Sequence, residues 1–248
     1  MKVGFPKSGT TWVNFLLANT FALSAGLELD IHFRNFRYWV ATSDSHPSAP
    51  PLHDYPKIIS NHNIYEKQVY LDKDTISIYV MRHPGDVMES YYHFESKAWM
   101  DGPPINGFKN FIRDENWGIP SWKKHVSSWK GNWDVLVKFE DLKKDPEKEL
   151  EKILDPLDLE VEDTVIERAV EASSFNSMKR MEEKYGRIEK NNMNPEFKFM
   201  REGESDGGKD YFDAEDYRYM EENLDDLLED FGYSLPEGTS ETRIKDDN

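Results

Sequence analysis

Short apolar runs that predict β-strands alternate along this chain with longer segments of helical periodicity. The clearest run is 75–81 (TISIYVM), which is β-branched and uncharged, as strands covered on both faces tend to be. Shorter runs predict further strands at 2–5, 57–60 and 134–139. Because strands that alternate with helices form βαβ units, the pattern predicts an α/β domain with a central, mainly parallel sheet flanked by helices.

Apolar residues recur at helical spacing between and after these runs. One helix is expected to begin near Thr10, and another follows the turn at 82–85 with Asp86 as its candidate cap. Residues 145–146 (DP) should open a further helix, and the last is expected over 214–231, with a strongly acidic outer face. The helix that opens at 145–146 has an apolar stripe of Leu150, Ile153 and Leu154. Two more stripes are formed by Trp122, Val126 and Trp129, and by Val165, Ile166, Ala169 and Val170.

Proline, glycine and polar residues predict long loops at 42–56, 99–107 and 184–209. A chain of 248 residues suits one domain of the larger kind. We therefore expect a single domain over 1–235 and a frayed tail over 236–248.

Charge and composition narrow the class of partner. The chain carries 31 basic and 48 acidic residues, a net charge of −17, which disfavours nucleic acid and anionic membranes. It has no cysteine, which excludes disulfides and thiolate metal sites, and no apolar run near the ~20 residues that span a bilayer. The first residues also lack the apolar segment of a signal peptide. These features predict a cytoplasmic protein with a small-molecule partner, as a monomer or a homodimer.

The loop after the first predicted strand has the pattern of an anion site. Residues 4–11 (GFPKSGTT) place Gly9 and free backbone amides at a helix start, where an anion is stabilised. The glycines and the last threonine match the P-loop pattern, but Thr10 holds the lysine position and Lys7 lies three residues earlier. This displacement disfavours an ATPase or GTPase. Taken alone, the loop is equally compatible with an ordinary strand-to-helix turn.

A second candidate anion contact follows the strand at 75–81. Arg82 could offer paired donors to a phosphate, and Ser90 adds a hydroxyl about two helical turns later. Taken alone, Arg82 is more simply explained as a surface ion pair at the helix start. Ligands of parallel sheets bind at the carboxyl ends of the strands, so Lys7 and Arg82 are expected to share one crevice.

Both segments resemble motifs of the cytosolic sulfotransferase family. Residues 6–12 (PKSGTTW) are similar to its 5′-phosphosulfate loop, and 82–94 (RHPGDVMESYYHF) to its 3′-phosphate motif. Weaker matches occur at 139–142 (FEDL), 173–179 (SSFNSMK) and 199–203 (FMREG). The family transfers a sulfuryl group from 3′-phosphoadenosine 5′-phosphosulfate (PAPS) to an acceptor hydroxyl or amine, without a metal. The resemblance therefore implies PAPS as the cofactor and a P-loop-like phosphosulfate loop.

The resemblance also implies roles for individual residues. Lys7 would contact the bridging oxygen and the sulfuryl group, Trp12 would stack on adenine, and Arg201 would hold the 3′-phosphate. The full set that it implies in cofactor binding is Lys7, Ser8, Gly9, Thr10, Thr11, Trp12, Arg82, Ser90, Ser173, Phe175, Phe199, Met200, Arg201 and Gly203.

Catalysis requires a base for the acceptor proton, and a histidine is the natural one. In the family this histidine follows a strand, and 57–62 (KIISNH) at the equivalent place makes His62 the candidate. Ser90 would restrain Lys7 before the acceptor arrives. Without the resemblance, His62 is more simply a surface histidine.

The chain departs from the family at two charged positions. Ser60 and Glu202 stand where the family has lysines, which removes two positive charges near a polyanionic cofactor. Three functions stay open: a PAPS-dependent sulfotransferase acting on a small, uncharged or apolar acceptor, a catalytically idle nucleotide-binding protein of the same fold, and a P-loop nucleotide kinase.

Overall fold

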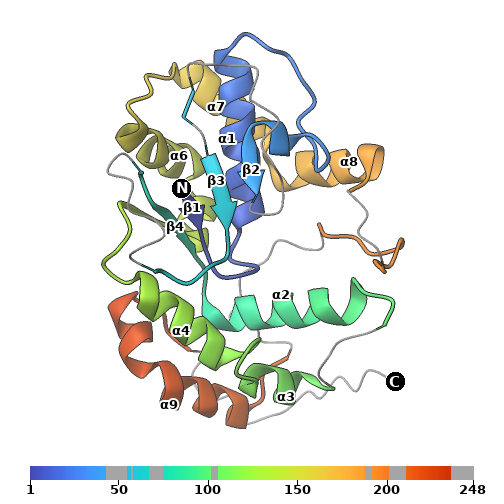
Figure 1. Cartoon of the computed structure of the whole chain (residues 1–248), viewed down its shortest axis with the longest axis vertical. Coiled ribbons are helices and arrows are strands. Elements are labelled where there is room, and N and C mark those ends of the chain that lie inside the picture. Colours follow the sequence, from blue (N-terminus) through green and yellow to red (C-terminus); the bar gives the residue numbers. More distant parts are fainter. Residues whose placement is uncertain are drawn as a thin grey trace.

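Five strands form one sheet, in the order β2-β3-β1-β4-β5, and their pairings are parallel (Figure 1). The strands are β1 (Lys2–Val3), β2 (Val40–Thr42), β3 (Ile58–Asn61), β4 (Ile78–Met81) and β5 (Val135–Lys138). This computed structural model describes residues 1–42, 55–56, 58–66, 75–101, 106–187, 192–200 and 211–235. The predicted α/β architecture is confirmed.

Four of the strands lie where the apolar runs predicted them, and β2 was not predicted. Strand β4 occupies only the last four residues of the run at 75–81. Strand β2 has three residues and pairs with β3 alone, at the edge of the sheet. Such a short edge strand leaves no alternating pattern long enough to recognise in the sequence.

Helices cover both faces of the sheet (Figure 1). One face carries α1 (Thr10–Ser24), α6 (Pro146–Leu154), α7 (Asp163–Ala172) and α8 (Phe175–Tyr185), and the other carries α2 (Pro84–Lys97), α3 (Phe108–Arg113), α4 (Ile119–Trp129) and α9 (Ala214–Asp230). The remaining short helices are η1 (Phe36–Tyr38), α5 (Phe139–Lys144) and η2 (Asp155–Leu157). Each face has its own cluster of buried apolar side chains.

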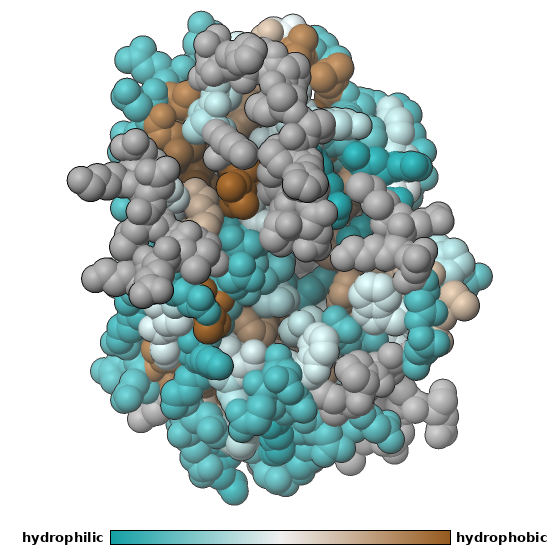
Figure 2. Space-filling model, viewed as in Figure 1, coloured by the Kyte–Doolittle hydropathy of each residue, from teal (hydrophilic) through white to brown (hydrophobic). Residues whose placement is uncertain are grey.

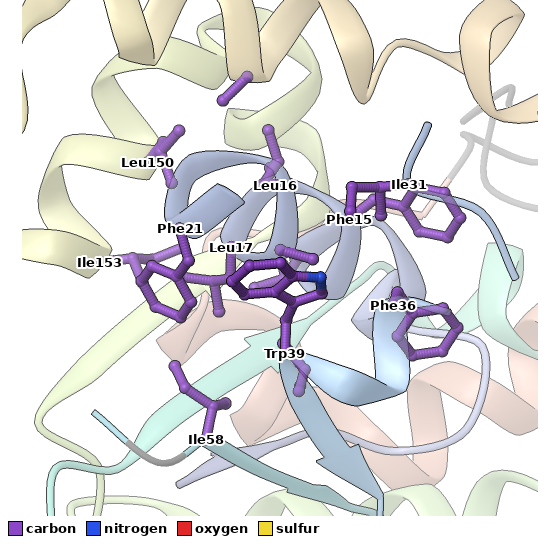
Figure 3. Packing of buried hydrophobic residues seen from close by; sticks show 14 of the residues in the cluster. Phe15, Leu16, Leu17, Phe21, Ile31, Phe36, Trp39, Ile58, Leu150 and Ile153 are labelled. Atoms are coloured by element: carbon purple, nitrogen blue, oxygen red, sulfur yellow. The ribbon is translucent and has the colours of Figure 1, made fainter. Parts of the chain in front are cut away.

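Helix α1 is buried along most of its length, which fixes its start at the end of the sheet. Phe15, Leu17 and Phe21 are almost fully buried, in the same cluster as Ile58 of β3 and Ile153 of α6 (Figure 3). Because burial of such side chains contributes roughly 1.5–3 kcal/mol each, the helix is held firmly against the strands. Its first turn, directly after the predicted anion loop, is held with it.

The predicted helix caps are right in one case and wrong in another. Asp145 accepts the Lys148 amide at 3.2 Å and opens α6 as expected. Helix α2 is capped instead by His83, whose Nδ1 accepts the Gly85 amide at 3.1 Å, while Asp86 lies inside the first turn. There the carboxylate complements the positive end of the helix and pairs with Arg82.

Helix α8 was not predicted. Only two methionines and one phenylalanine give it an apolar face, and its buried positions include the polar Ser177 and Glu182. It begins with the side chain of Ser174 accepting the Ser177 amide, an ordinary N-cap. The predicted loop at 184–209 therefore starts only after Tyr185.

Parts of the predicted loops and the predicted tail fall outside the described residues. These parts are 43–54, 102–105, 188–191, 201–210 and 236–248. Within the described part, Trp99 forms an isolated antiparallel bridge with Met193, which joins the end of α2 to the segment 192–200. Figure 2 shows a largely hydrophilic lower face over α4 and α9, in agreement with the exposed acidic residues of α9. No helix in the described ranges is long and apolar enough to cross a membrane.

Candidate active site

The carboxyl ends of four neighbouring strands meet at one edge of the sheet. Val3 of β1 is paired with Asn61 of β3 and with Tyr79 of β4, and Met81 is paired with Lys138 of β5. The next residues along these strands are therefore neighbours in space: His62, the loop at 4–9, Arg82 and Phe139. The structure thus brings the predicted residues Lys7, Arg82 and His62 to the same edge.

The loop at 4–9 has a backbone that few sequences can adopt. Lys7 and Gly9 both have positive φ, 69° and 95°. A β-carbon at Gly4 would lie 2.4 Å from the carbonyl oxygen of Val80, and one at Gly9 would lie 2.5 Å from Cδ2 of Phe139. Glycine is therefore needed twice for close approach, and the strained Lys7 indicates a functional loop more than an ordinary turn.

Two polar groups of this loop are buried without a hydrogen-bond partner. They are the hydroxyl of Ser8 and the indole Nε1 of Trp12. Buried polar groups in proteins are normally satisfied, so an orphaned donor beside a helix start has the chemistry of an anion site. Gly9, Thr10 and Thr11 complete the turn that leads into α1.

The ammonium of Lys7 lies between two aromatic rings. Its Nζ is 4.4 Å from the ring centroid of Phe94 and 4.0 Å from that of Phe199. Burial raises the pKa of the neighbouring Glu95, while a hydrogen bond from Trp99 and the charge of Lys7 lower it. A buried carboxylate beside Lys7 is a feature that the sequence analysis missed, because nothing in the local pattern separates Glu95 from the other acidic residues of α2.

Arg82 is held by the ring of Phe139. The guanidinium Cζ lies 4.4 Å from the ring centroid, and Nε lies 3.6 Å from Oδ2 of Asp86. Only 12% of the Arg82 side chain is exposed, so it is no ordinary surface ion pair. The same ring of Phe139 packs edge-on against Trp12, with centroids 5.6 Å apart. Phe139 thus connects the two predicted phosphate-binding segments.

His62 has a defined tautomer. Its Nδ1 lies 2.6 Å from the carbonyl oxygen of Gly4, which can only accept, so Nδ1 carries the proton and Nε2 offers a lone pair. The side chain is exposed. The next residues are fixed by α4: Trp129 donates from Nε1 to the Asn63 carbonyl at 2.9 Å, and the Tyr65 amide donates to the Ser128 hydroxyl at 3.0 Å.

One buried lysine and one buried histidine at this edge were not anticipated. Lys2 of β1 is fully buried and donates to the Thr10 carbonyl at 2.6 Å, and burial lowers its pKa well below the ordinary range. His125 lies behind His62, with Nδ1 2.8 Å from the hydroxyl of Tyr79, and burial lowers its pKa to about 4. A lysine in a strand as short as β1, which has two residues, carries no sequence signal of burial.

The remaining predicted site residues lie in different settings. Ser173 is fully buried and accepts a hydrogen bond from Asn19 at 2.9 Å, while Phe175 begins α8 and packs on the core. The amides of Phe199 and Met200 donate to the Glu182 carboxylate at 2.8 and 2.9 Å. Ser90 is half-buried on α2. Arg201, Glu202 and Gly203 lie outside the described residues.

The sequence of the whole domain matches one known family. The family model of the sulfotransferase domain matches residues 1–232. The chain belongs to this sulfotransferase family. It is accordingly an enzyme of the PAPS-dependent class, as the two phosphate motifs predicted.

Curated relatives and solved structures agree with this assignment. Sulfotransferase 2A2 of Rattus norvegicus is 27% identical over 84% of this chain and 76% of its own length. Sulfotransferase 1C2 of Oryctolagus cuniculus is 30% identical over 71% of this chain, which spans 64% of that relative. A mouse sulfotransferase SULT7A1 complexed with PAP covers 93% of this chain and 83% of its own, with a TM-score of 0.64 and 21% identity. Retinol dehydratase in complex with retinol and PAP covers 95% and 82%, with a TM-score of 0.70 and 19% identity. These last two show the fold.

The described residues of this sulfotransferase fit a nucleotide with two anionic ends. The orphaned Ser8 hydroxyl and the start of α1 lie at one position, and the ring-held Arg82 lies at another. Within the described ranges, no group of three or more histidine, aspartate or glutamate side chains is arranged to hold a metal ion.

Proposed function

We propose that this sulfotransferase moves the sulfuryl group of PAPS to a hydroxyl, or an amine, of a small acceptor with an apolar body. The observation that carries the proposal is the contact between His62 Nδ1 and the Gly4 carbonyl, because it occupies Nδ1 and leaves Nε2 to act as a base beside the loop that holds Lys7. A positioned base and a positioned cation are the two groups that such a transfer needs.

The donor would be held by the predicted residues of the two motifs. Backbone amides and hydroxyls at 8–11 would bind its 5′-phosphate end, and Arg82 with Ser90 would bind its 3′-phosphate. Trp12 and Phe175 would contact the adenine. The roles of Ser173, Phe199, Met200, Arg201 and Gly203 stay predictions from the family resemblance.

PAPS, when bound, supplies the sulfuryl group and a phosphate leaving group for an in-line transfer. Nε2 of His62 takes the proton of the acceptor as its oxygen or nitrogen attacks. The ammonium of Lys7 stabilises the negative charge that develops on the leaving oxygen, a contribution that is largest in a water-poor site. Ser90 restrains the lysine until the acceptor is present. None of these roles requires a metal.

Aromatic side chains near Lys7 support an apolar acceptor body. Phe94 packs against Trp99 and Phe197, with ring centroids 6.0 and 5.6 Å apart, and Phe199 lies on the other side of the Lys7 ammonium. Aromatic walls with a few polar groups are typical of small-molecule sites. Retinol and androsterone, the molecules named with the neighbouring retinol dehydratase structures, are of this apolar kind. A cytoplasmic location and the choice between monomer and homodimer stay predictions.

A titration separates this function from its two alternatives. Adenosine 3′,5′-bisphosphate (PAP) should bind without magnesium, and more tightly than Mg-ATP. A preference for Mg-ATP would favour a nucleotide kinase. Turnover of PAPS against a panel of phenols and alcohols then distinguishes the enzyme from an idle nucleotide-binding protein, which would bind PAP and transfer nothing.

A further inference from the structure

Two arginines beside the proposed site make no ion pair with another described residue. Arg37 lies in η1, and Arg187 lies two residues beyond the end of α8. Neither is part of a salt bridge in the described ranges. Nε of Arg37 and Nη1 of Arg187 are buried without a hydrogen-bond partner. Both residues are half-buried, and a buried guanidinium nitrogen is normally paired, so the two orphaned nitrogens call for a ligand.

Arg187 shares an aromatic ring with Lys7. Its Cζ lies 4.3 Å from the ring centroid of Phe199, and Nζ of Lys7 lies 4.0 Å from the same centroid. The Arg187 guanidinium also lies 5.4 Å from the ring centroid of Phe33. The Lys7 ammonium and the Arg187 guanidinium are therefore close enough for one small aromatic acid to contact both. Because Lys7 is expected to contact the sulfuryl group, Arg187 lies near the expected position of the transferred group.

The charges around Arg187 do not balance. Burial lowers the pKa of Arg187, the charge of Glu182 raises it, and the like charge of Arg37 lowers it. The Glu182 carboxylate is already engaged by the amides of Phe199 and Met200. Among the described residues, the charges that act on Arg187 are thus one carboxylate, already engaged, and a second guanidinium, in a protein whose net charge is −17. An oxyanion placed between the arginines would restore the balance and satisfy their orphaned donors.

We propose that Arg37 and Arg187 bind an anionic substituent, a carboxylate or another oxyanion, carried by the acceptor. This inference rests on the proposed sulfuryl transfer and extends it from an uncharged guest to an apolar body with one negative group. The acceptor is the better source of the anion than the donor. Both phosphate ends of the donor have candidate partners in the loop at 8–11 and in Arg82 with Ser90, and the arginine pair belongs to neither segment.

Binding of an unreactive acceptor analogue tests the site independently of turnover. The probes are 4-methoxyphenylacetate and its methyl ester, titrated by calorimetry into the full chain saturated with PAP. We expect the acid to bind roughly 10-fold or more tightly than the ester, as a charge-assisted contact predicts. Arg187→Gln should remove this preference without weakening the ester, and Arg187→Lys should retain part of it.

The matched control is Arg34→Gln, which removes the same charge from an exposed residue three positions before Arg37. It should leave the preference for the acid intact, and Arg37→Gln should reduce it. Equal binding of acid and ester to the unmodified protein would overturn the proposal. So would an equal effect of Arg34→Gln, or a loss of PAP affinity in Arg187→Gln as large as the loss of acid binding, because the pair would then serve the donor.

A parallel assay keeps the two proposals apart. Transfer from PAPS is measured with 4-hydroxyphenylacetate and with its methyl ester as acceptors. If neither phenol is sulfated but Arg187→Gln still abolishes binding of the methoxy acid, the proposed function fails and the anion site stands. If both phenols are sulfated with equal kcat/KM and the methoxy acid shows no preference, the function stands and the anion site fails.

Discussion

His62 Nδ1 and the carbonyl oxygen of Gly4 are 2.6 Å apart, which ties the imidazole to the loop that follows β1 and carries Lys7. The two residues are 58 positions apart in the chain and adjacent in the sheet, because β1 and β3 pair in parallel. The contact fixes the tautomer of His62. It also holds His62 against the backbone of the loop that contains Lys7. The proposed base and the proposed cation are thereby positioned by one pair of strands.

Replacement of His62 should abolish transfer but preserve donor binding. Removal of a general base typically costs about 10²–10⁴ in rate, so His62→Ala should lower kcat by that order. Because the imidazole contacts the loop through a backbone carbonyl, which is not a donor to the nucleotide, PAP affinity should change little. His32→Ala, which alters a histidine stacked on Tyr185, is the control for both measurements. Near-normal turnover in His62→Ala would remove this residue from the role of base.

The role of Arg82 is measurable by comparing two nucleotides. Arg82→Gln should weaken PAP roughly 10- to 100-fold, because a charge-assisted phosphate contact is lost. It should barely change the affinity for 5′-AMP, which lacks the 3′-phosphate. Calorimetric titration of both nucleotides into both proteins gives the comparison. Equal weakening of the two nucleotides would show that Arg82 acts through the shape of the site and not on the 3′-phosphate.

Gly9 should tolerate no side chain, for two separable reasons. Gly9→Ala places a β-carbon 2.5 Å from Cδ2 of Phe139 and also forces an alanine to φ 95°. Gly26→Ala is the matched control, since Gly26 has φ 70° and nothing within 4 Å of an added β-carbon. The control should lose about 1 kcal/mol of unfolding free energy, and Gly9→Ala should lose clearly more. Only Gly9→Ala should also lose PAP binding. Thermal unfolding with and without PAP measures both effects.

The free energy of unfolding should decrease as the pH is lowered through the range in which His125 stays neutral in the folded protein. Burial lowers its pKa from 6.5 to about 4, so between these values the unfolded chain binds a proton that the folded chain does not. Stability is then complete above pH 6.5 and decreases as the pH falls towards 4, by up to about 3 kcal/mol. Chemical denaturation at several pH values checks this.

The matched variant for that experiment is His125→Gln, which keeps a polar group near Tyr79 but does not titrate. Its free energy of unfolding should vary less between pH 6.5 and 4 than that of the unmodified protein. An unchanged pH dependence would mean that other groups, chiefly carboxylates, carry the effect. Tyr79→Phe removes only the hydroxyl contact of 2.8 Å and should cost about 1 kcal/mol at neutral pH.

The strands and motifs at the carboxyl edge were predictable because their signals are local. An uncharged β-branched run at 75–81 indicates a buried strand, and a glycine-bearing loop before an apolar helix indicates an anion site. The cap of α2 was mispredicted for an equally local reason. Asp86 is a good capping residue by type, but Pro84 starts the helix earlier and leaves the cap position to His83.

The sequence by itself determined the α/β architecture, the order of the phosphate motifs along the chain and the family to which they point. Those properties follow from periodicity and from short contiguous segments. The tertiary structure decided which side chains meet: His62 with Gly4, Phe139 with both Gly9 and Arg82, and Lys7 with Phe94, Phe199 and Arg187. The physical reason is that parallel strands gather the ends of distant segments at one edge, so the electrostatics of the site depend on neighbours that no local pattern contains.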